Sequence, residues 1–281
     1  MGLQDAADLQ AWVGRSIEAE DIVTPRLVES FRAMLSPHAA ITTSDATPLG
    51  LHWCLAPDIA ETHELGPDGH PPKGSFLPPV PLPRRMWAAS DLTFNGAIGP
   101  GEQVRRRSTI SKVEEKQGRS GSLFFVTIRH EIRTAAEPVI AEDQTIVYRE
   151  AVAPGRPPAL APAALPSAPH ERPVDVNPVL LFRYSALTFN GHRIHYDLPY
   201  ATEVEHYPGL VIHGPLQATL LLNFAAVIGD RPPKRFSFRG TNPATGPQRL
   251  MLRATPGENG ALALEVQSAD GNVTMKATAQ W

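Results

Sequence analysis

The sequence contains a single cysteine, Cys54. One cysteine cannot form an intramolecular disulfide, so we expect a reducing compartment. The residues around it (LHWCLAP) are apolar, which favours a buried core thiol over a reactive nucleophile.

The chain also lacks a strong charge of either sign and a long apolar run. Its 281 residues carry 26 Lys and Arg against 29 Asp and Glu, a formal net charge of −3. This balance gives no reason to expect nucleic acid or a membrane surface as a partner. No apolar run approaches the roughly 20 residues of a membrane-spanning helix. The N-terminal residues are acidic and amphipathic, unlike a signal or transit peptide, so we expect a cytoplasmic protein.

Apolar residues make up 42% of the chain, enough for a substantial core. In the first half, residues 3–36 show helical spacing interrupted by proline, which predicts two helices. The apolar stretch 49–57 could form a short core helix. Residues 56–86 are rich in Pro and Gly and predict a long irregular segment, which in a compact domain is usually functional or disordered. From Trp87 onward, alternating residues and turn signals predict consecutive antiparallel strands up to residue 151.

Residues 152–173 form a Pro/Ala-rich linker that divides the chain into halves of similar size. In the second half, residues 180–189 (LLFRYSALTF) resemble a strand. Residues 215–230 are apolar almost all round and predict a buried helix that starts at a Gly-Pro step. Four strands with turn signals between them follow. The pentapeptide LTFNG occurs at 92–96 and again at 187–191, which is too short to establish a duplication.

The richest stretch in polar chemistry runs from Tyr184 to Pro215 and contains four of the ten histidines. Histidine is the side chain whose unperturbed pKa lies nearest neutrality, so it is the usual carrier of protons in catalysis. This stretch leads directly into the predicted apolar helix, whose N-terminus would offer backbone N–H groups to an anion. The sequence therefore predicts a proton-transfer site beside an oxyanion-binding helix start.

Three segments carry a family resemblance: FNGHRIHYD (189–197), YPGLVIHGPLQATLL (207–221) and PLPRRMWA (81–88). Together with the linker, they resemble the MaoC-like and (R)-specific enoyl-CoA hydratase family. More narrowly, they resemble its mesaconyl-C4-CoA (3-methylfumaryl-CoA) hydratase and 3-hydroxyacyl-thioester dehydratase branch. The resemblance covers nearly the whole chain and is most specific at 184–222.

The resemblance implies an α+β double hotdog, two units that each wrap an antiparallel sheet round a central apolar helix. The first unit, 1–151, would be the substrate- and CoA-binding half. The second, 174–281, would carry the catalytic motif. The implied enzyme is a hydro-lyase that acts on an acyl-CoA thioester without a cofactor or a metal. The duplicated fold leaves both a monomer and a homodimer open.

The family's hydratase motif has an aspartate followed five residues later by a histidine. Here those positions hold Asn190 and His195, so His195 is the expected catalytic histidine, whereas Asn190 departs from the family pattern. An amide can hold a water molecule but cannot take its proton at neutral pH. We therefore expect His195 to transfer protons and Asn190 to position water, unless Asn190 only caps a turn. The resemblance places the oxyanion-binding N–H at Gly214, and Asp197 is a candidate for the missing carboxylate.

The expected reaction is hydration of a short, branched, dicarboxylic enoyl-CoA, either mesaconyl-C4-CoA or itaconyl-CoA, to citramalyl-CoA. A free carboxylate on the acyl group needs a cation. The expected substrate-binding residues are Arg84, Arg85, Trp87, Arg193, Tyr196 and His213.

The sequence also leaves other functions open. A dehydratase of straight-chain 3-hydroxyacyl thioesters, a thioesterase and a non-catalytic acyl-CoA-binding protein could share the scaffold. His192 and His195 with Asp197 or His213 could also hold a metal, although no firm metal motif is present.

Overall fold

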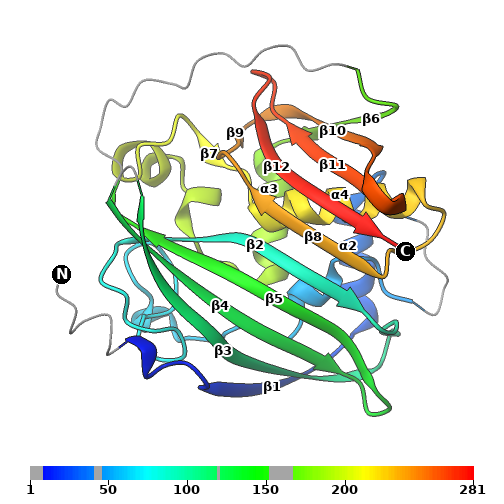
Figure 1. Cartoon of the computed structure of the whole chain (residues 1–281). Coiled ribbons are helices and arrows are strands. Elements are labelled where there is room, and N and C mark those ends of the chain that lie inside the picture. The colour runs from blue at the N-terminus through cyan, green and yellow to red at the C-terminus, as the bar shows by residue number, and fades with distance from the viewer. Residues whose placement is uncertain (1–8, 41–45, 119–120, 152–166) are drawn as a thin grey trace.

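The computed structural model describes residues 9–40, 46–118, 121–151 and 167–281. Their dominant feature is one curved, antiparallel, ten-stranded sheet (Figure 1). The strands of its first half are β1 (Ser16–Ile22), β2 (Arg84–Phe94), β3 (Gln103–Gly118), β4 (Gly121–Arg133) and β5 (Pro138–Arg149). Those of its second half are β6 (His170–Val176), β8 (Arg235–Gly240), β10 (Gln248–Pro256), β11 (Leu262–Gln267) and β12 (Val273–Gln280). Two short strands, β7 (Leu210–Val211) and β9 (Thr245–Gly246), pair separately.

The strand order shows that the two halves repeat one topology. From one edge the order is β1-β3-β4-β5-β2, and from the other edge it is β6-β10-β11-β12-β8. The halves join where β2 pairs with β8, with Leu92 opposite Phe236. Each half therefore begins with a strand at an outer edge of the sheet, β1 or β6, and places its next strand in the large sheet, β2 or β8, at the centre, as expected for a double hotdog.

The helices lie against the concave side of this sheet (Figure 1). They are α2 (Pro25–Leu35), α3 (Pro178–Thr188) and α4 (Gly214–Ile228). In α4 every residue from Leu216 to Ala226 is buried, and it packs on β10, β11 and β12. A helix that is apolar on every side is stable only inside a core, so the buried helix predicted at 215–230 is confirmed.

Among the described residues of the N-terminal half, no helix is comparable to α4. The stretch predicted as a core helix, 49–57, contains only the single 3₁₀ turn η1 (Leu51–Cys54), although that turn is buried. The left-handed Gly50 before η1 and extended Leu55 after it stop helix propagation. Cys54 is buried, as predicted, and burial raises the pKa of its thiol to about 12.

Two further predictions of local structure were wrong, the first of them in part. Of the first predicted N-terminal helix, residues 3–8 lie outside the described residues and Leu9 and Gln10 are helical, but Ser16–Ile22 form β1, whose full ladder with β3 local spacing could not reveal. Residues 180–188 form most of α3 rather than a strand, with Phe189 as its C-cap, because Asn177 caps the helix by accepting the Leu180 N–H and Pro178 occupies its first turn. The LTFNG repeat therefore lies on β2 in one copy and at the end of α3 in the other.

The irregular segment predicted at 56–86 is confirmed up to the start of β2, with one 3₁₀ turn, η2 (Thr62–Glu64). Most of the predicted linker, 152–166, lies outside the described residues, and its last residues from His170 already belong to β6. In the described part of the chain, no helix combines the length and apolarity needed to cross a bilayer.

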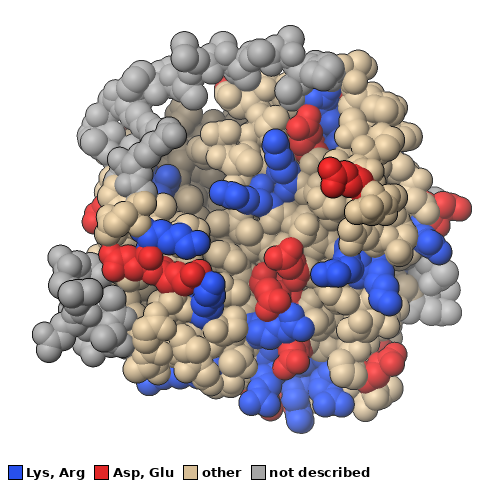
Figure 2. Space-filling view, viewed as in Figure 1, with Lys and Arg blue, Asp and Glu red and all other residues tan. Residues whose placement is uncertain are grey.

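The outer face of the sheet carries charges of both signs. Figure 2 shows acidic and basic side chains interspersed over the viewed face. Several form cross-strand pairs, such as Arg105 with Glu20 at 2.6 Å and Arg129 with Asp143 at 2.8 Å. Because these pairs are exposed, each contributes little to stability.

Candidate active site

The site is organised around the N-terminus of α4. His213 is the N-cap residue, and Gly214 begins the helix. The N–H groups of a first helical turn have no partner within the helix, so Gly214 offers a donor at the positive end of the helix dipole. A Cβ atom placed on Gly214 would lie 3.6 Å from the Trp87 carbonyl oxygen, so the helix start abuts β2 at the joint between the halves.

His195 lies at the end of the 3₁₀ turn η3 (Arg193–His195), with only 7% of its surface exposed. Its Nδ1 lies 2.7 Å from the Val211 carbonyl oxygen, which can only accept, so Nδ1 carries the proton. The other nitrogen, Nε2, therefore has a free lone pair. Burial, partly offset by this hydrogen bond, lowers the pKa of His195 to about 4, so the ring is neutral at pH 7 and can act as a base.

His213 supports His195 from one side. The two rings stack at 3.6 Å between centroids and 18° between planes. His213 is fully buried, and its Nε2 forms a 2.8 Å hydrogen bond with the Ser185 hydroxyl on α3. Burial holds the pKa of His213 well below its usual value. These contacts fix the plane of His195 without adding a positive charge beside it.

Asn190 lies just after α3, and its side chain forms a local turn. The Oδ1 atom accepts the backbone N–H of His192 at 3.0 Å. This is the turn-capping arrangement that the sequence left open, and it uses one lone pair of the amide oxygen. Asp197, the candidate for the missing carboxylate, accepts the Tyr200 N–H and the Arg193 guanidinium, and both interactions lower its pKa.

Two residues that sequence reasoning missed, Asp68 and His70, reach this site from the irregular segment. The Asp68 carboxylate accepts His70 Nδ1–H at 2.8 Å and the His70 backbone N–H at 3.1 Å. The His70 ring lies 4.1 Å from that of His192, which lies 5.5 Å from that of His195 and nearly perpendicular to it. Burial would raise the pKa of Asp68, but the hydrogen bonds from His70 outweigh it and lower that pKa.

Two glycines allow the segment that carries Asp68 and His70 to lie against the segment that carries His192. A Cβ on Gly69 would lie 2.0 Å from the Gly191 carbonyl oxygen, and a Cβ on Gly191 would lie 2.6 Å from the Gly69 carbonyl oxygen. No other residue type permits such backbone contact. The Arg193 N–H also donates to the Asp68 carbonyl oxygen at 2.9 Å. A sequence signal was available, because Asp-Gly-His at 68–70 parallels Asn-Gly-His at 190–192.

The same cluster is the place where a metal would most readily fit. Asp68, His70 and His192 each bring one potential ligand atom to within 4.8 Å of the others. The 2.8 Å separation of Asp68 and His70 is that of a hydrogen bond, so the described arrangement is an acid–imidazole pair. The absence of a metal stays a prediction.

The three candidate arginines differ in their partners. Arg84 is buried and pairs with Glu205 at 3.1 Å. Arg193 pairs with Asp197 at 2.8 Å. In the described part of the chain, no carboxylate lies within ion-pair distance of Arg85, which donates to the Pro71 carbonyl oxygen at 2.9 Å. Arg85 is half-buried and next to the loop that carries His70.

Trp87 and Tyr196, the two aromatic residues predicted to bind substrate, lie in different environments. Trp87 packs against Trp53 and Phe238, and its indole N–H lies 2.8 Å from the Ser90 hydroxyl oxygen. Tyr196 is 47% exposed and donates its hydroxyl to the Gly191 carbonyl oxygen at 2.9 Å. Tyr196 thereby steadies the turn that carries His192.

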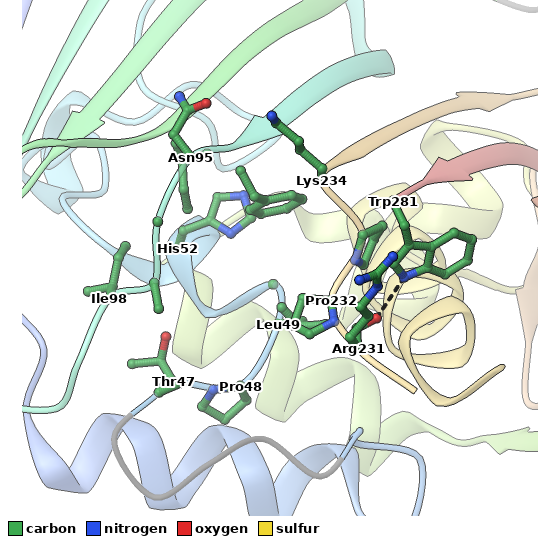
Figure 3. Close-up of a pocket in the computed structure, with 17 residues that line it drawn as sticks. Thr47, Pro48, Leu49, His52, Asn95, Ile98, Arg231, Pro232, Lys234 and Trp281 are labelled. Carbon is green, nitrogen blue, oxygen red and sulfur yellow. Dashed lines mark hydrogen bonds between the residues drawn. The ribbon is translucent and has the colours of Figure 1, made fainter. Parts of the chain in front are cut away.

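Of two cavities among the described residues, one lies between the two halves and the other in the N-terminal half, and His195 lines neither. One of about 450 Å³ lies beyond the C-terminal end of α4, between the loops around Pro48, Asn95 and Pro232 (Figure 3). The other, about 170 Å³, is lined by Trp53, Trp87 and the buried Glu142, whose pKa burial raises to about 7. The candidate groups His195 and Gly214 lie at the opposite end of α4 from the larger cavity.

The chain is similar to several known proteins. Residues 50–246 match the family model for hydroxyacyl-thioester dehydratase type 2. The mesaconyl-C(4)-CoA hydratase of Chloroflexus aurantiacus is 42% identical over 280 residues, 98% of each chain. The mitochondrial hydroxyacyl-thioester dehydratase type 2 of Schizosaccharomyces pombe is 29% identical, over 83% of this chain and 88% of its own.

A solved Mycobacterium tuberculosis protein described as having a double hotdog fold aligns over 98% of this chain and 96% of its own. Its TM-score is 0.57 at 14% identity, a likeness of fold alone. The match to the family model and the 42% identical relative together show the family, which the likeness of fold alone could not. This chain belongs to the hydroxyacyl-thioester dehydratase type 2 family, and it is a hydro-lyase with the double hotdog fold.

Proposed function

We propose that this enzyme hydrates mesaconyl-C4-CoA to citramalyl-CoA, with itaconyl-CoA as a close substrate variant. The observation that carries this substrate is the 42% identity, over 98% of both chains, to a protein of that named activity. The site geometry supports the reaction class, because it offers a neutral base and a helix N-terminus to an enoyl thioester.

The mechanism follows from the placement of these groups. The thioester oxygen binds the Gly214 N–H at the start of α4, where one such donor is worth about 3 kcal/mol to a developing oxyanion. Water attacks the β carbon while His195 Nε2 takes its proton, and the π electrons move onto the thioester oxygen as an enolate. The His195 imidazolium then returns the proton to the α carbon. Such acid–base catalysis contributes on the order of 10²–10⁴-fold.

Arg85 is the cation that we assign to the free carboxylate of the acyl group. In mesaconyl-C4-CoA this carboxylate is attached to the carbon that water attacks, so its partner must lie beside the histidine cluster. Arg84 and Arg193 already have carboxylate partners, whereas Arg85 has a backbone carbonyl. Trp87, Tyr196 and His213 then act as walls and supports of the site.

The same proposal assigns roles to the two halves of the chain. Residues 1–151 supply Arg85 and the walls of the acyl pocket, and residues 174–281 supply His195 and Gly214. The enzyme would work in the cytoplasm on CoA thioesters, either as a monomer or as a homodimer.

Dehydration of straight-chain 3-hydroxyacyl thioesters is the second candidate, because the family model and the S. pombe relative carry that name. A thioesterase or an acyl-CoA-binding protein would need neither a base beside the β carbon nor an enolate site.

Incubation with mesaconyl-C4-CoA, crotonyl-CoA and a saturated acyl-CoA separates these functions. Enoyl absorbance and free thiol are followed together. Loss of enoyl absorbance without thiol release, fastest with mesaconyl-C4-CoA, is the expected result. A preference for crotonyl-CoA would favour the straight-chain enzyme, thiol release would show a thioesterase, and binding without turnover would refute catalysis.

A further inference from the structure

His192 has no role in the mechanism above, yet its ring centroid lies 5.5 Å from that of His195. It is only 8% exposed, and its ring lies 4.1 Å from that of His70 as well as near that of His195. Its backbone N–H is held by Asn190 Oδ1. The segment therefore presents the side chain of residue 192 to the site, while the side chain of residue 190 shapes the turn.

We propose that His192 is a second catalytic residue, which holds the attacking water together with His195, and that Asp68 and His70 position its ring. This inference rests on the hydratase function proposed above. It adds His192 to the water-holding task expected of Asn190, whose Oδ1 accepts the His192 backbone N–H and so ties the two residues together.

The positioning argument starts at Asp68. Its carboxylate accepts His70 Nδ1–H, which sets the tautomer and plane of the His70 ring. His70 packs on His192 at 4.1 Å and restricts its rotation. The Gly69–Gly191 backbone contact and the bond from Arg193 N to the Asp68 carbonyl oxygen fix the two segments against each other. The Asp68–His70 hydrogen bond, the ring contact with His70 and the backbone contacts between the two segments therefore together hold the orientation of the His192 imidazole.

The charge state of His192 suits the task of holding the attacking water. Burial is the largest factor lowering the pKa of His192, and the neighbouring His70, His195 and Arg85 lower it further. Asp68 is the other charged group that acts on His192, and it raises this pKa, but burial and the cationic neighbours outweigh it. A neutral imidazole keeps one nitrogen as an acceptor for a water proton.

The step balances without any further reactant. The water oxygen bonds to the β carbon, one water proton moves to His195 Nε2, and the π pair becomes the enolate. The second water proton stays on the product hydroxyl and remains hydrogen-bonded to the free nitrogen of His192. The His195 imidazolium then protonates the α carbon, which returns every group to its starting state.

The first test compares His192→Ala and His192→Gln with the wild type, using whichever enoyl-CoA the wild type hydrates. Misplacing a reactant by about 1 Å can cost on the order of 10²-fold, so His192→Ala should lower kcat by about that factor with little change in KM. His192→Gln keeps an amide acceptor and should retain more activity. A His192→Ala enzyme with kcat within about threefold of the wild type would overturn the inference.

The second test asks whether Asp68 acts through His192. Asp68→Asn should lower kcat in the wild type but have no further effect in the His192→Ala background, since coupled residues are non-additive. The matched control is Glu61→Gln, because Glu61 pairs with His63 at 3.2 Å in the same segment but both side chains are exposed. Equal effects of Asp68→Asn in both backgrounds would show a merely structural role.

Gly69→Ala tests the contact between the segments and should reduce kcat as strongly as His192→Ala. Gly74→Ala is its control, because Gly74 has a similar positive φ of 92° but would place its Cβ 3.7 Å from Pro79, without a clash. Similar kcat values for the two glycine variants would contradict the role of the contact.

Dialysis against 1,10-phenanthroline should leave the activity unchanged, and a loss that zinc restores would overturn the assignment in favour of a metal site. If the wild type hydrates no enoyl-CoA, the proposed function fails. If it does so and the His192 variants match it, this inference alone fails.

Discussion

Replacing Arg85 with glutamine tests which cation recognises the free carboxylate of the acyl group. Arg85 is half-buried, and no carboxylate of the described chain neutralises it. At 4 Å and an effective dielectric constant of about 20, two unit charges attract by about 4 kcal/mol. Partial exposure of Arg85 reduces this, and hydrogen bonds to charged groups are worth about 1.5–3 kcal/mol. We therefore expect a loss of about 2 kcal/mol, or roughly 30-fold in kcat/KM.

The assay compares mesaconyl-C4-CoA with 3-methylcrotonyl-CoA, in which a methyl group replaces the carboxylate on the same carbon skeleton. Arg85→Gln should lower kcat/KM for the first substrate and leave it nearly unchanged for the second. Arg129→Gln is the control, because Arg129 forms an exposed pair with Asp143 on the outer face of the sheet. Equal losses on both substrates would place Arg85 at the CoA moiety, and no loss on either would refute its role in binding.

Three further outcomes follow from the site and its scaffold. His195→Ala should reduce hydration by at least 10²-fold with an unchanged circular dichroism spectrum, and near-normal turnover would remove His195 from the mechanism. Because burial lowers the pKa of His195 to about 4, kcat/KM should stay level from pH 8 to 6 and fall only near pH 4; a midpoint near 6.5 would contradict this assignment. Asn223→Ala should lower the free energy of unfolding in urea by about 2–4 kcal/mol, because fully buried Asn223 bonds Ala40 N–H and the Leu49 carbonyl oxygen; a loss below 1 kcal/mol would refute that role.

Much of the fold was readable from local patterns. Strands β2 to β5, β8 and β10 to β12 alternate or carry turn signals, and α4 is apolar all round, so the residues of each segment indicate its environment. The errors lay where tertiary pairing or capping decided the outcome. Strand β1 owes its form to its ladder with β3, and α3 begins at a cap that an apolar, β-like composition concealed.

For the site, the sequence by itself determined that histidines gather just before an apolar helix that starts at Gly214, and family resemblance selected His195 among them. That much is local, because the helix start and the histidines share one stretch of chain. Only the tertiary structure brought Asp68 and His70 to His192, over more than 120 intervening residues, through a backbone contact that glycine alone permits. Only the tertiary structure also gave Arg84 and Arg193 carboxylate partners, since an ion pair depends on which side chains the fold places together.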